Sequence, residues 1–204
     1  ELLAWFLDDV VDELGSRREV EYALQILQEG TSADRQLAVW RQRSRRDFTM
    51  AVNIASRQFQ EPGLTDLVTD LLQRHHLEAQ HLELEITEST LMQHVPTTAE
   101  TLAALAQLGV HIALDDFGTG YSSLAYLCRF EFDKIKIDRS FITGQTRNAA
   151  SRTIIQAVAT LGRGLGLSVV AEGVETEADA LMIKHLGCTE MQGYFFSRPV
   201  PETD

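Results

Sequence analysis

The chain alternates between two kinds of segment, and this alternation restricts its fold more than any other feature. Strand-like runs, rich in β-branched and aromatic residues, cover 48–54, 82–86, 110–116, 134–138, 168–173 and 190–196. Runs with helical spacing of leucine, alanine and other apolar residues cover 63–75, 98–109, 148–166 and 175–187, and a short one starts at 122. Repeated strand–helix units predict an α/β protein with a parallel sheet.

Two α/β folds are compatible with this pattern. With "ELLAWF" (1–6) as a further strand, the segments could form a doubly wound sheet or a (β/α)8 TIM-type barrel. No G-x-G-x-x-G motif follows the first strand, so a dinucleotide-binding sheet has little support. A full barrel takes about 250 residues, and this chain has 204. We therefore expect one domain over 1–204, a barrel that lacks its first strand. In the helix over 148–166, Ile154, Val158 and Leu161 are expected on one face.

Composition excludes some partners. The net charge of -12 argues against a DNA-binding protein or a membrane-surface protein, because both need a basic face. An anionic ligand would then need a bound divalent metal to attract it. Cys128 and Cys188 lie far apart, which fits reduced thiols in a cytoplasmic protein, and no apolar run reaches membrane-spanning length. The chain begins abruptly at Glu1, so we expect it to be cut from a longer protein.

Polar residues gather at the C-terminal ends of the predicted strands. They are Asn53, Glu85, Asp115, Asp116, Lys136, Glu172 and Gln192. In a βα barrel these ends share the face on which active sites are built. Clustered carboxylates repel one another unless a cation neutralises them, and oxygen ligands suit Mg²⁺ or Mn²⁺. Two such ions, about 3.5–4 Å apart, can clamp the attacking water and the leaving oxygen of a phosphate ester.

Each carboxylate, taken alone, has another interpretation. Asp115 and Asp116 precede a glycine and could form an ordinary turn. Glu172 could be an acid at a helix N-terminus. Glu85 could belong to the polar half of an alternating strand, with Glu83 as its twin.

The lysine of the set is also ambiguous. Lys134 and Lys136 are two residues apart, so strand alternation puts both on one face and does not choose between them. The combination of strand-end residues, rather than any one of them, favours a site.

Six motifs carry a family resemblance. "VNIASRQF" (52–59), "LELEITES" (82–89), "DDFGTGYSSLAYL" (115–127), "FDKIKIDRSFI" (132–142), "VVAEGVET" (169–176) and "MQGYFFSRP" (191–199) resemble the EAL domain of bacterial cyclic di-GMP phosphodiesterases. The resemblance covers nearly the whole chain from about residue 36. It implies a (β/α)8-type barrel whose first strand is antiparallel to the rest, and this is the strand we expect to be missing.

The resemblance also implies roles for individual residues. "ELLAWF" resembles the Glu-Ala-Leu motif itself, with Glu1 as its glutamate. The implied ligands of one metal are Glu1, Asn53, Glu85 and Asp115, and those of the second are Asp115, Asp116 and Glu172. Lys136 matches the lysine that holds the attacking water or the scissile phosphate, Glu88 the glutamate that anchors the "DDFGTGYSS" loop, and Gln192 a glutamine near the water and the guanine.

The activity implied is hydrolysis of cyclic di-GMP to linear pGpG by a water that two Mg²⁺ or Mn²⁺ ions activate, with Lys136, Glu172 and Glu1 in catalysis. The family further implies a homodimer and a sensory or other signalling domain before Glu1.

Two departures from the family support an alternative. The family has an arginine that reaches a substrate phosphate where this chain has Trp5, and indole cannot make that charge-assisted contact, worth about 1.5–3 kcal/mol. By the same resemblance, the stretch 7–40 is shorter than its family equivalent. A degenerate module that binds cyclic di-GMP or a protein partner without turnover is therefore the competing hypothesis. Retention of every matching metal ligand favours the enzyme.

Overall fold

A computed structural model describes residues 49–54, 56, 59, 63–74, 78–93, 95–119, 124–143 and 148–198. These residues fall into two compact units. The described part of the first lies within Glu1–Ile86 and Thr90–His111, and the second comprises Thr87–Ser89 and Ile112–Arg198. The predicted strand at 1–6, with Glu1 and Trp5, and the stretch 7–40 lie outside the described residues.

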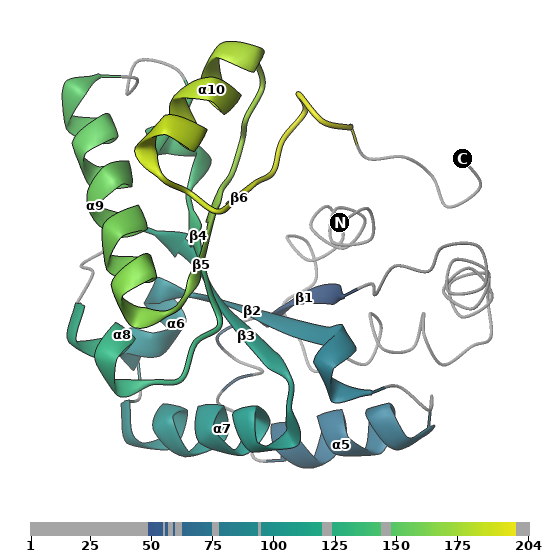
Figure 1. Cartoon of the computed structure of the whole chain (residues 1–204). Helices are drawn as coiled ribbons and strands as arrows, with labels where there is room; N and C mark the ends of the chain where they lie inside the picture. Colours follow the sequence, from purple (N-terminus) through teal and green to yellow (C-terminus); the bar gives the residue numbers. More distant parts are fainter. Residues whose placement is uncertain are drawn as a thin grey trace. The chain divides into compact units, whose positions relative to one another are not determined.

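The first unit contains a parallel strand pair. Strand β1 (Met50–Ile54) pairs with β2 (Leu82–Thr87), and Asn53 lies opposite Glu85. Helices α5 (Leu64–Arg74) and α7 (Val95–Leu108) lie side by side in Figure 1. A 3-10 turn, η1 (Ala79–His81), leads into β2, and a short helix, α6 (Glu88–Gln93), follows it. Sequence periodicity predicted all of these except η1 and α6.

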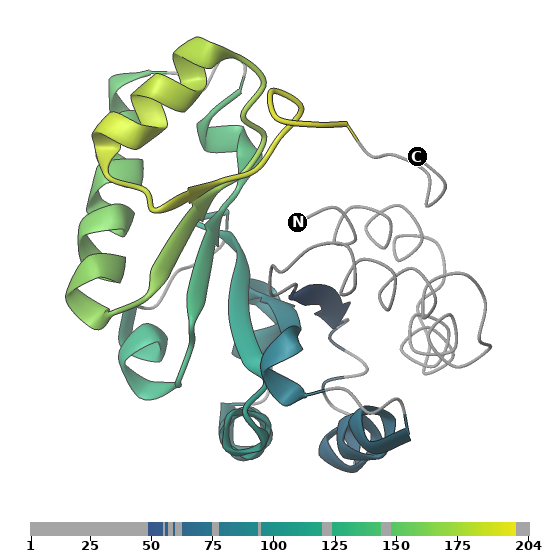
Figure 2. The same cartoon turned by 45° about the vertical axis from the view of Figure 1, so that its right-hand side comes forward.

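The second unit is a parallel sheet with helices on it. Its elements are β3 (His111–Phe117), α8 (Leu124–Arg129), β4 (Lys134–Ile137), η2 (Arg139–Phe141), α9 (Ala149–Leu165), β5 (Ser168–Ala171), α10 (Glu177–Leu186) and β6 (Glu190–Met191). Strands β3 to β6 pair in chain order, and every pair is parallel. Helix α9 runs along β4 and β5 and beside α10 (Figure 2). The predicted alternating α/β architecture is thus observed.

Local signals fix the ends of the two long helices of the second unit. The side chain of Asn148 caps α9 by accepting a hydrogen bond from the Ser151 N–H (3.0 Å), and Thr176 caps α10 through the Asp179 N–H (3.2 Å). Each helix stops at a glycine in the left-handed conformation, Gly166 (φ +76°) or Gly187 (φ +96°). These bounds follow the sequence prediction closely.

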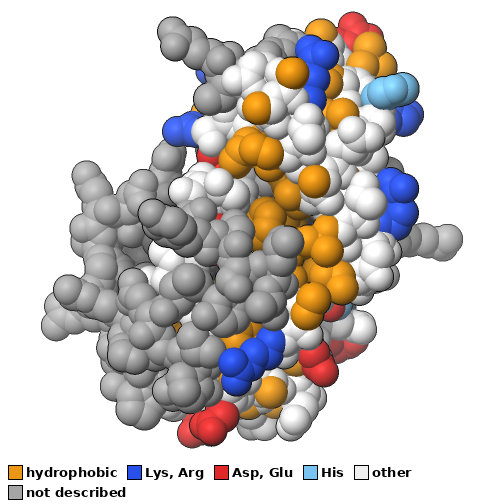
Figure 3. All heavy atoms as spheres, turned by 90° about the vertical axis from the view of Figure 1, so that its left-hand side faces the viewer, with side chains coloured by type: hydrophobic (Ala, Val, Ile, Leu, Met, Phe, Trp, Pro, Cys, Tyr) orange, Lys and Arg blue, Asp and Glu red, His pale blue; other side chains and the backbone are white. Residues whose placement is uncertain are grey.

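The buried face of α9 differs from the prediction at two positions: Leu161 is only half-buried, and Ile155 takes the place of Ile154. Ile155 is fully buried, whereas Ile154 is 40% exposed and Val158 lies in the core. Both isoleucines have helical spacing to Val158, but the stripe centred on Ile155 meets the sheet. Figure 3 views the face on which α9 lies and shows apolar side chains exposed among polar ones there.

The last predicted strand is much shorter than 190–196. Only Glu190 and Met191 pair with β5, and the chain then turns, with the Phe196 N–H donating to the Gly193 carbonyl oxygen (3.0 Å). The glycine after Gln192 interrupts the apolar run. In the part of the chain that is described, no helix has the length and apolar character needed to cross a bilayer.

Candidate functional site

Asp115 and Asp116 form a bulge inside β3. Leu114 pairs with Ile135 and Phe117 with Ile137, so the two aspartates together face one residue of β4, Lys136. The Asp116 N–H donates to Oδ1 of Asp115 (2.9 Å), and Asp116 has φ +54°, in the left-handed region. Both aspartates thus belong to the strand, and a turn begins at Asp116, whose carbonyl oxygen accepts a hydrogen bond from the Thr119 N–H (3.3 Å). A bulge re-aims side chains, and bulges are common beside active sites.

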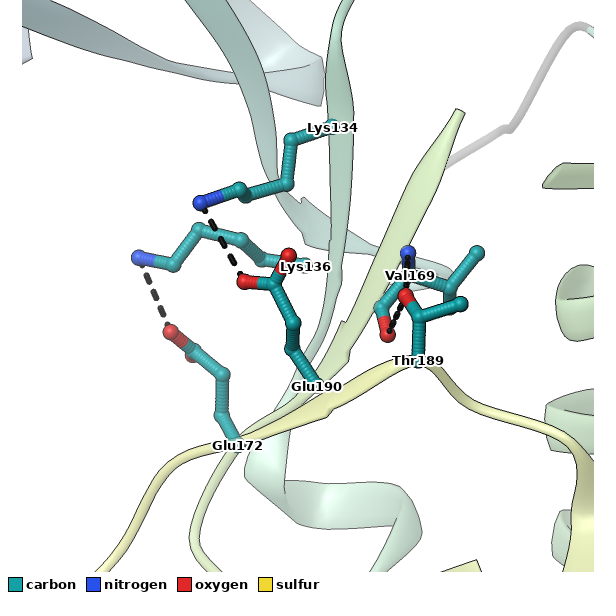
Figure 4. A network of polar contacts seen from close by, with 6 residues as sticks. All are labelled: Lys134, Lys136, Val169, Glu172, Thr189 and Glu190. Carbon is teal, nitrogen blue, oxygen red and sulfur yellow. Dashed lines mark hydrogen bonds and ion pairs between the residues drawn. The ribbon is translucent and has the colours of Figure 1, made fainter. Parts of the chain in front are cut away.

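The ammonium group of Lys136 lies between two carboxylates. Its Nζ is 2.9 Å from Oε1 of Glu172 (Figure 4) and 3.4 Å from Oδ1 of Asp115. Lys136 is only 4% exposed. A buried ammonium is stable only when it is paired, and Asp115 and Glu172 both supply such pairing. Carboxylates from the bulge of β3 and from the end of β5 thus converge on one cation.

Burial separates the two lysines that the sequence left equivalent. Lys134 Nζ pairs with Oε2 of Glu190 at 3.4 Å, and the Lys134 and Glu190 side chains are 22% and 41% exposed (Figure 4). The Lys136 side chain is 5% exposed. Lys136 is therefore the more deeply buried of the two lysines, a difference that strand alternation alone did not predict. Sequence reasoning missed Glu190, although its position two residues before Gln192 places both on one face of the chain.

Glu172 lies directly after β5 and is half-buried. Its N–H donates to the Ile137 carbonyl oxygen (3.1 Å), which continues the pairing of β5 with β4. The N-cap of α10 is Thr176, four positions further on. The interpretation of Glu172 as an acid at a helix N-terminus is therefore wrong.

Glu85 and its twin Glu83 are both buried in β2. They are 5% and 6% exposed, and the strand is buried on both faces from Leu82 to Ile86. A solvated, alternating face is therefore the wrong interpretation for Glu85. Two carboxylates in one buried strand need polar or cationic surroundings.

Glu88 contacts the backbone that follows the aspartate bulge. Its Oε2 accepts a hydrogen bond from the Gly118 N–H (3.3 Å), and Glu88 is 6% exposed. Thr119 turns back on the same segment, because its Oγ1 donates to the Asp116 carbonyl oxygen (2.9 Å). The residues 120–123 that complete this loop lie outside the described ranges.

Gln192 is placed by backbone hydrogen bonds at the end of β5. Its N–H donates to the Ala171 carbonyl oxygen (2.9 Å), and its own carbonyl oxygen accepts from the Val174 N–H (3.0 Å). Gln192 therefore lies beside the chain that carries Glu172.

The donor chemistry of the predicted ligands suits a hard divalent ion, because carboxylate and amide oxygens are the groups that Mg²⁺ and Mn²⁺ prefer. Within the described residues, no three histidine, cysteine, aspartate or glutamate side chains are arranged to hold a metal ion. Of the predicted ligands, Glu1 lies outside those residues, and Asn53 and Glu85 belong to the first unit. The ligand assignment therefore stays a prediction.

Known proteins share this sequence and fold. A family model described as "EAL domain" matches residues 27–199. The bifunctional diguanylate cyclase/cyclic di-GMP phosphodiesterase MucR of Pseudomonas aeruginosa is 45% identical over 169 residues, which are 83% of this chain and 25% of MucR. The signaling protein YkoW of Bacillus subtilis is 41% identical over 83% of this chain and 21% of its own length. The chain thus spans about a quarter of the length of these relatives.

Solved structures give the same result. The PaMucR phosphodiesterase in a c-di-GMP complex matches with a TM-score of 0.80 and 43% identity, covering 89% of this chain and 72% of that one. The EAL domain of Mycobacterium smegmatis DcpA matches with a TM-score of 0.79 and 35% identity, over 94% of this chain and 82% of that one. The predicted barrel-type α/β fold is confirmed by these matches. The chain belongs to the EAL domain family.

Proposed function

We propose that this chain hydrolyses cyclic di-GMP to linear pGpG, with two Mg²⁺ or Mn²⁺ ions as cofactors. The observation that carries the proposal is the buried Lys136 ammonium between Asp115 and Glu172. Support also comes from the family, because a relative in this family is named a cyclic di-GMP phosphodiesterase and another, BlrP1 of Klebsiella pneumoniae, was solved as a manganese/c-di-GMP complex.

Lys136 would act on the phosphate or on the water that attacks it. Its ammonium carries three donors and a full positive charge, and the walls around it exclude most solvent. A fixed cation in such a site stabilises the negative charge that develops on a phosphoryl group without first having to reorganise. Asp115 and Glu172 hold it in place through the two ion pairs.

The carboxylates would hold the metal ions. We assign Glu1, Asn53, Glu85, Asp115, Asp116 and Glu172 as oxygen ligands, with Glu1 and Glu172 close to the reacting water. Two bound ions would supply Lewis-acid activation of water and neutralise charge on the phosphate.

Glu88 and Gln192 would shape the substrate side. The hydrogen bond from the Gly118 N–H to Glu88 supports a role for Glu88 in anchoring the loop after the bulge. Gln192 can both donate and accept through its amide, as recognition of a guanine edge requires. A homodimer, a cytoplasmic location and a signalling domain outside residues 1–204 are further expectations from the family.

The test is incubation with cyclic di-GMP and Mg²⁺ or Mn²⁺, with pGpG followed by chromatography. We expect turnover that excess EDTA abolishes and that Asp115→Asn removes. Lys136→Met should lower kcat by about 100-fold, the usual loss when one preorganised donor at a developing charge is removed.

One sequence feature favours a second candidate function. Trp5, where the family has an arginine, takes away a phosphate contact and suits a module that binds cyclic di-GMP or a protein partner without turnover. Nucleotide binding by calorimetry with no pGpG under either metal would establish that alternative and refute the enzyme.

A further inference from the structure

We propose that Lys134 is a positioning residue: by neutralising Glu190, it leaves the Lys136 ammonium to Asp115 and Glu172. The catalytic consequence of this pairing rests on the proposed function, but the pairing itself does not.

Both lysines extend from one face of the same strand. Lys134 and Lys136 are two residues apart in β4, and Figure 4 shows their side chains running in the same direction. Two ammonium groups on one face compete for the same carboxylates. Lys134 pairs with Glu190, whereas Lys136 pairs with Glu172 and Asp115.

The strand register makes this separation significant. Lys136 lies opposite Val170 in β5, and Val170 lies opposite Glu190 in β6. The backbone therefore places Glu190 level with Lys136, whereas Lys134 lies opposite Ser168, two residues earlier. Lys134 reaches forward along the sheet to pair with Glu190. In the same way Lys136 reaches forward to Glu172, two residues beyond Val170.

Thr189 fixes the backbone from which Glu190 projects. Its N–H donates to the Val169 carbonyl oxygen (3.0 Å), and its Oγ1 accepts from the Val169 N–H (2.7 Å) and donates to the Val169 carbonyl oxygen (3.1 Å). The hydroxyl contacts are drawn in Figure 4. A strand of two residues, Glu190 and Met191, is thereby held firmly in register. Glu190 therefore stays level with Lys136 when its own partner is removed.

Removal of the Lys134 charge should redirect Lys136. Without Lys134, the Glu190 carboxylate becomes a competitor at the level of Lys136. A lysine ammonium is a compact charge on a flexible stem, so it can follow the new partner. As the Lys136 ammonium moves toward Glu190, its ion pairs with Asp115 and Glu172 weaken. The proposed contact of the ammonium with phosphate or water weakens as well.

The test compares four proteins: wild type, Lys134→Met, Lys134→Arg, and Lys134→Met combined with Glu190→Gln. We expect Lys134→Met to lower kcat by about fivefold. Glu190 is partly exposed, so its attraction for the Lys136 ammonium should be about as strong as that of a surface ion pair. Lys134→Arg keeps the charge and should keep the activity. The double variant removes both the cation and the competitor, and it should return to within about twofold of wild type.

Crystal structures of the same variants give a measurement that does not need activity. In Lys134→Met we expect Lys136 Nζ at ion-pair distance from Glu190 and further from Asp115, and in the double variant the wild-type contacts of Lys136.

Unchanged Lys136 contacts in Lys134→Met, or a double variant as slow as the single one, would overturn the inference. If the wild type lacks phosphodiesterase activity, the proposed function fails, and the crystal structures still decide the role of Lys134.

Discussion

Asp116 combines a carboxylate with an unusual backbone angle. Its φ of +54° belongs to the left-handed region, which costs most L-residues about 1–2 kcal/mol. Aspartate tolerates the region better than most, because its short side chain bonds locally. Strained angles persist where the surroundings enforce them, and they cluster at functional sites. At this position the bulge against Lys136 imposes the angle.

We predict that Asp116→Gly separates stability from activity. Glycine adopts a positive φ without steric cost, so the free energy of unfolding in urea should rise by about 0.5–1 kcal/mol. Loss of the carboxylate should abolish pGpG formation. Asp115→Gly is the matched control, since the neighbouring aspartate has no positive φ and holds Lys136. It should lower both stability and activity. A less stable Asp116→Gly would contradict the strain argument.

Sequence located these residues but not their geometry. Active-site residues of a parallel α/β sheet lie at the C-terminal ends of its strands, so Asp115 and Glu172 could be selected from the pattern alone. The choice between Lys134 and Lys136 could not be made, because it depends on which carboxylates the neighbouring strands present. The bulge could not be predicted either, because it is defined by the pairing of β3 with β4, and the sequence of β3 alone does not give that pairing.

Helix α9 approaches β5 closely through a residue without a side chain. A Cβ on Gly162 would lie 2.3 Å from Cγ2 of Val169, which is buried. Two residues further along the same helix, a Cβ on Gly164 would meet nothing within 4 Å. The two glycines therefore serve different purposes, although their sequence context is nearly the same.

We predict opposite effects for the two alanine substitutions. Gly162→Ala should lower the free energy of unfolding by about 1–3 kcal/mol, because overpacking pushes α9 from the sheet. Gly164→Ala should raise it by about 0.5–1 kcal/mol, since alanine loses less backbone entropy in a helix. Urea denaturation of both variants measures the difference. Equal effects would show that Val169 moves aside easily.

Elements with long periodic patterns or clear caps were predictable. Helix α9 begins at its Asn148 cap and ends before Gly166, and both signals stand in the sequence. Helix α6 has six residues, too few for a periodic signal, and it was missed. Strand β6 was overestimated because an apolar run cannot report where hydrogen-bonded pairing stops. Ile154 was predicted in the core in place of Ile155 because the two lie four and three residues before Val158. Both spacings put a residue on the same helix face as Val158.

At the scale of the whole molecule, one buried thiol ties stability to alkaline pH. Burial raises the pKa of Cys188 from its ordinary 9.0 to about 11. The unfolded chain therefore releases this proton first as the pH rises. The contribution of Cys188 to stability is complete below pH 9 and is lost as the pH rises through about 11.

We predict that the free energy of unfolding falls by up to about 2–3 kcal/mol over this interval because of Cys188. Urea unfolding at several values of pH measures the fall, and Cys188→Ala should show a smaller one. Cys128→Ala keeps the Cys188 thiol and should behave as the wild type does. Identical pH profiles for Cys188→Ala and the wild type would refute the link.

The bulge in β3 also changes which residues of the strand lie on the same face. Along a regular strand, residues an even number apart share a face, and Ile135 and Ile137 of β4 follow that rule. Their partners in β3, Leu114 and Phe117, are an odd number apart, yet both are buried opposite those isoleucines. The extra residue reverses the odd–even count for everything after it. A chain that lost one aspartate would therefore return to the regular count: Leu114 and Phe117 would stay on the same side of the strand, and only the second carboxylate opposite Lys136 would be lost.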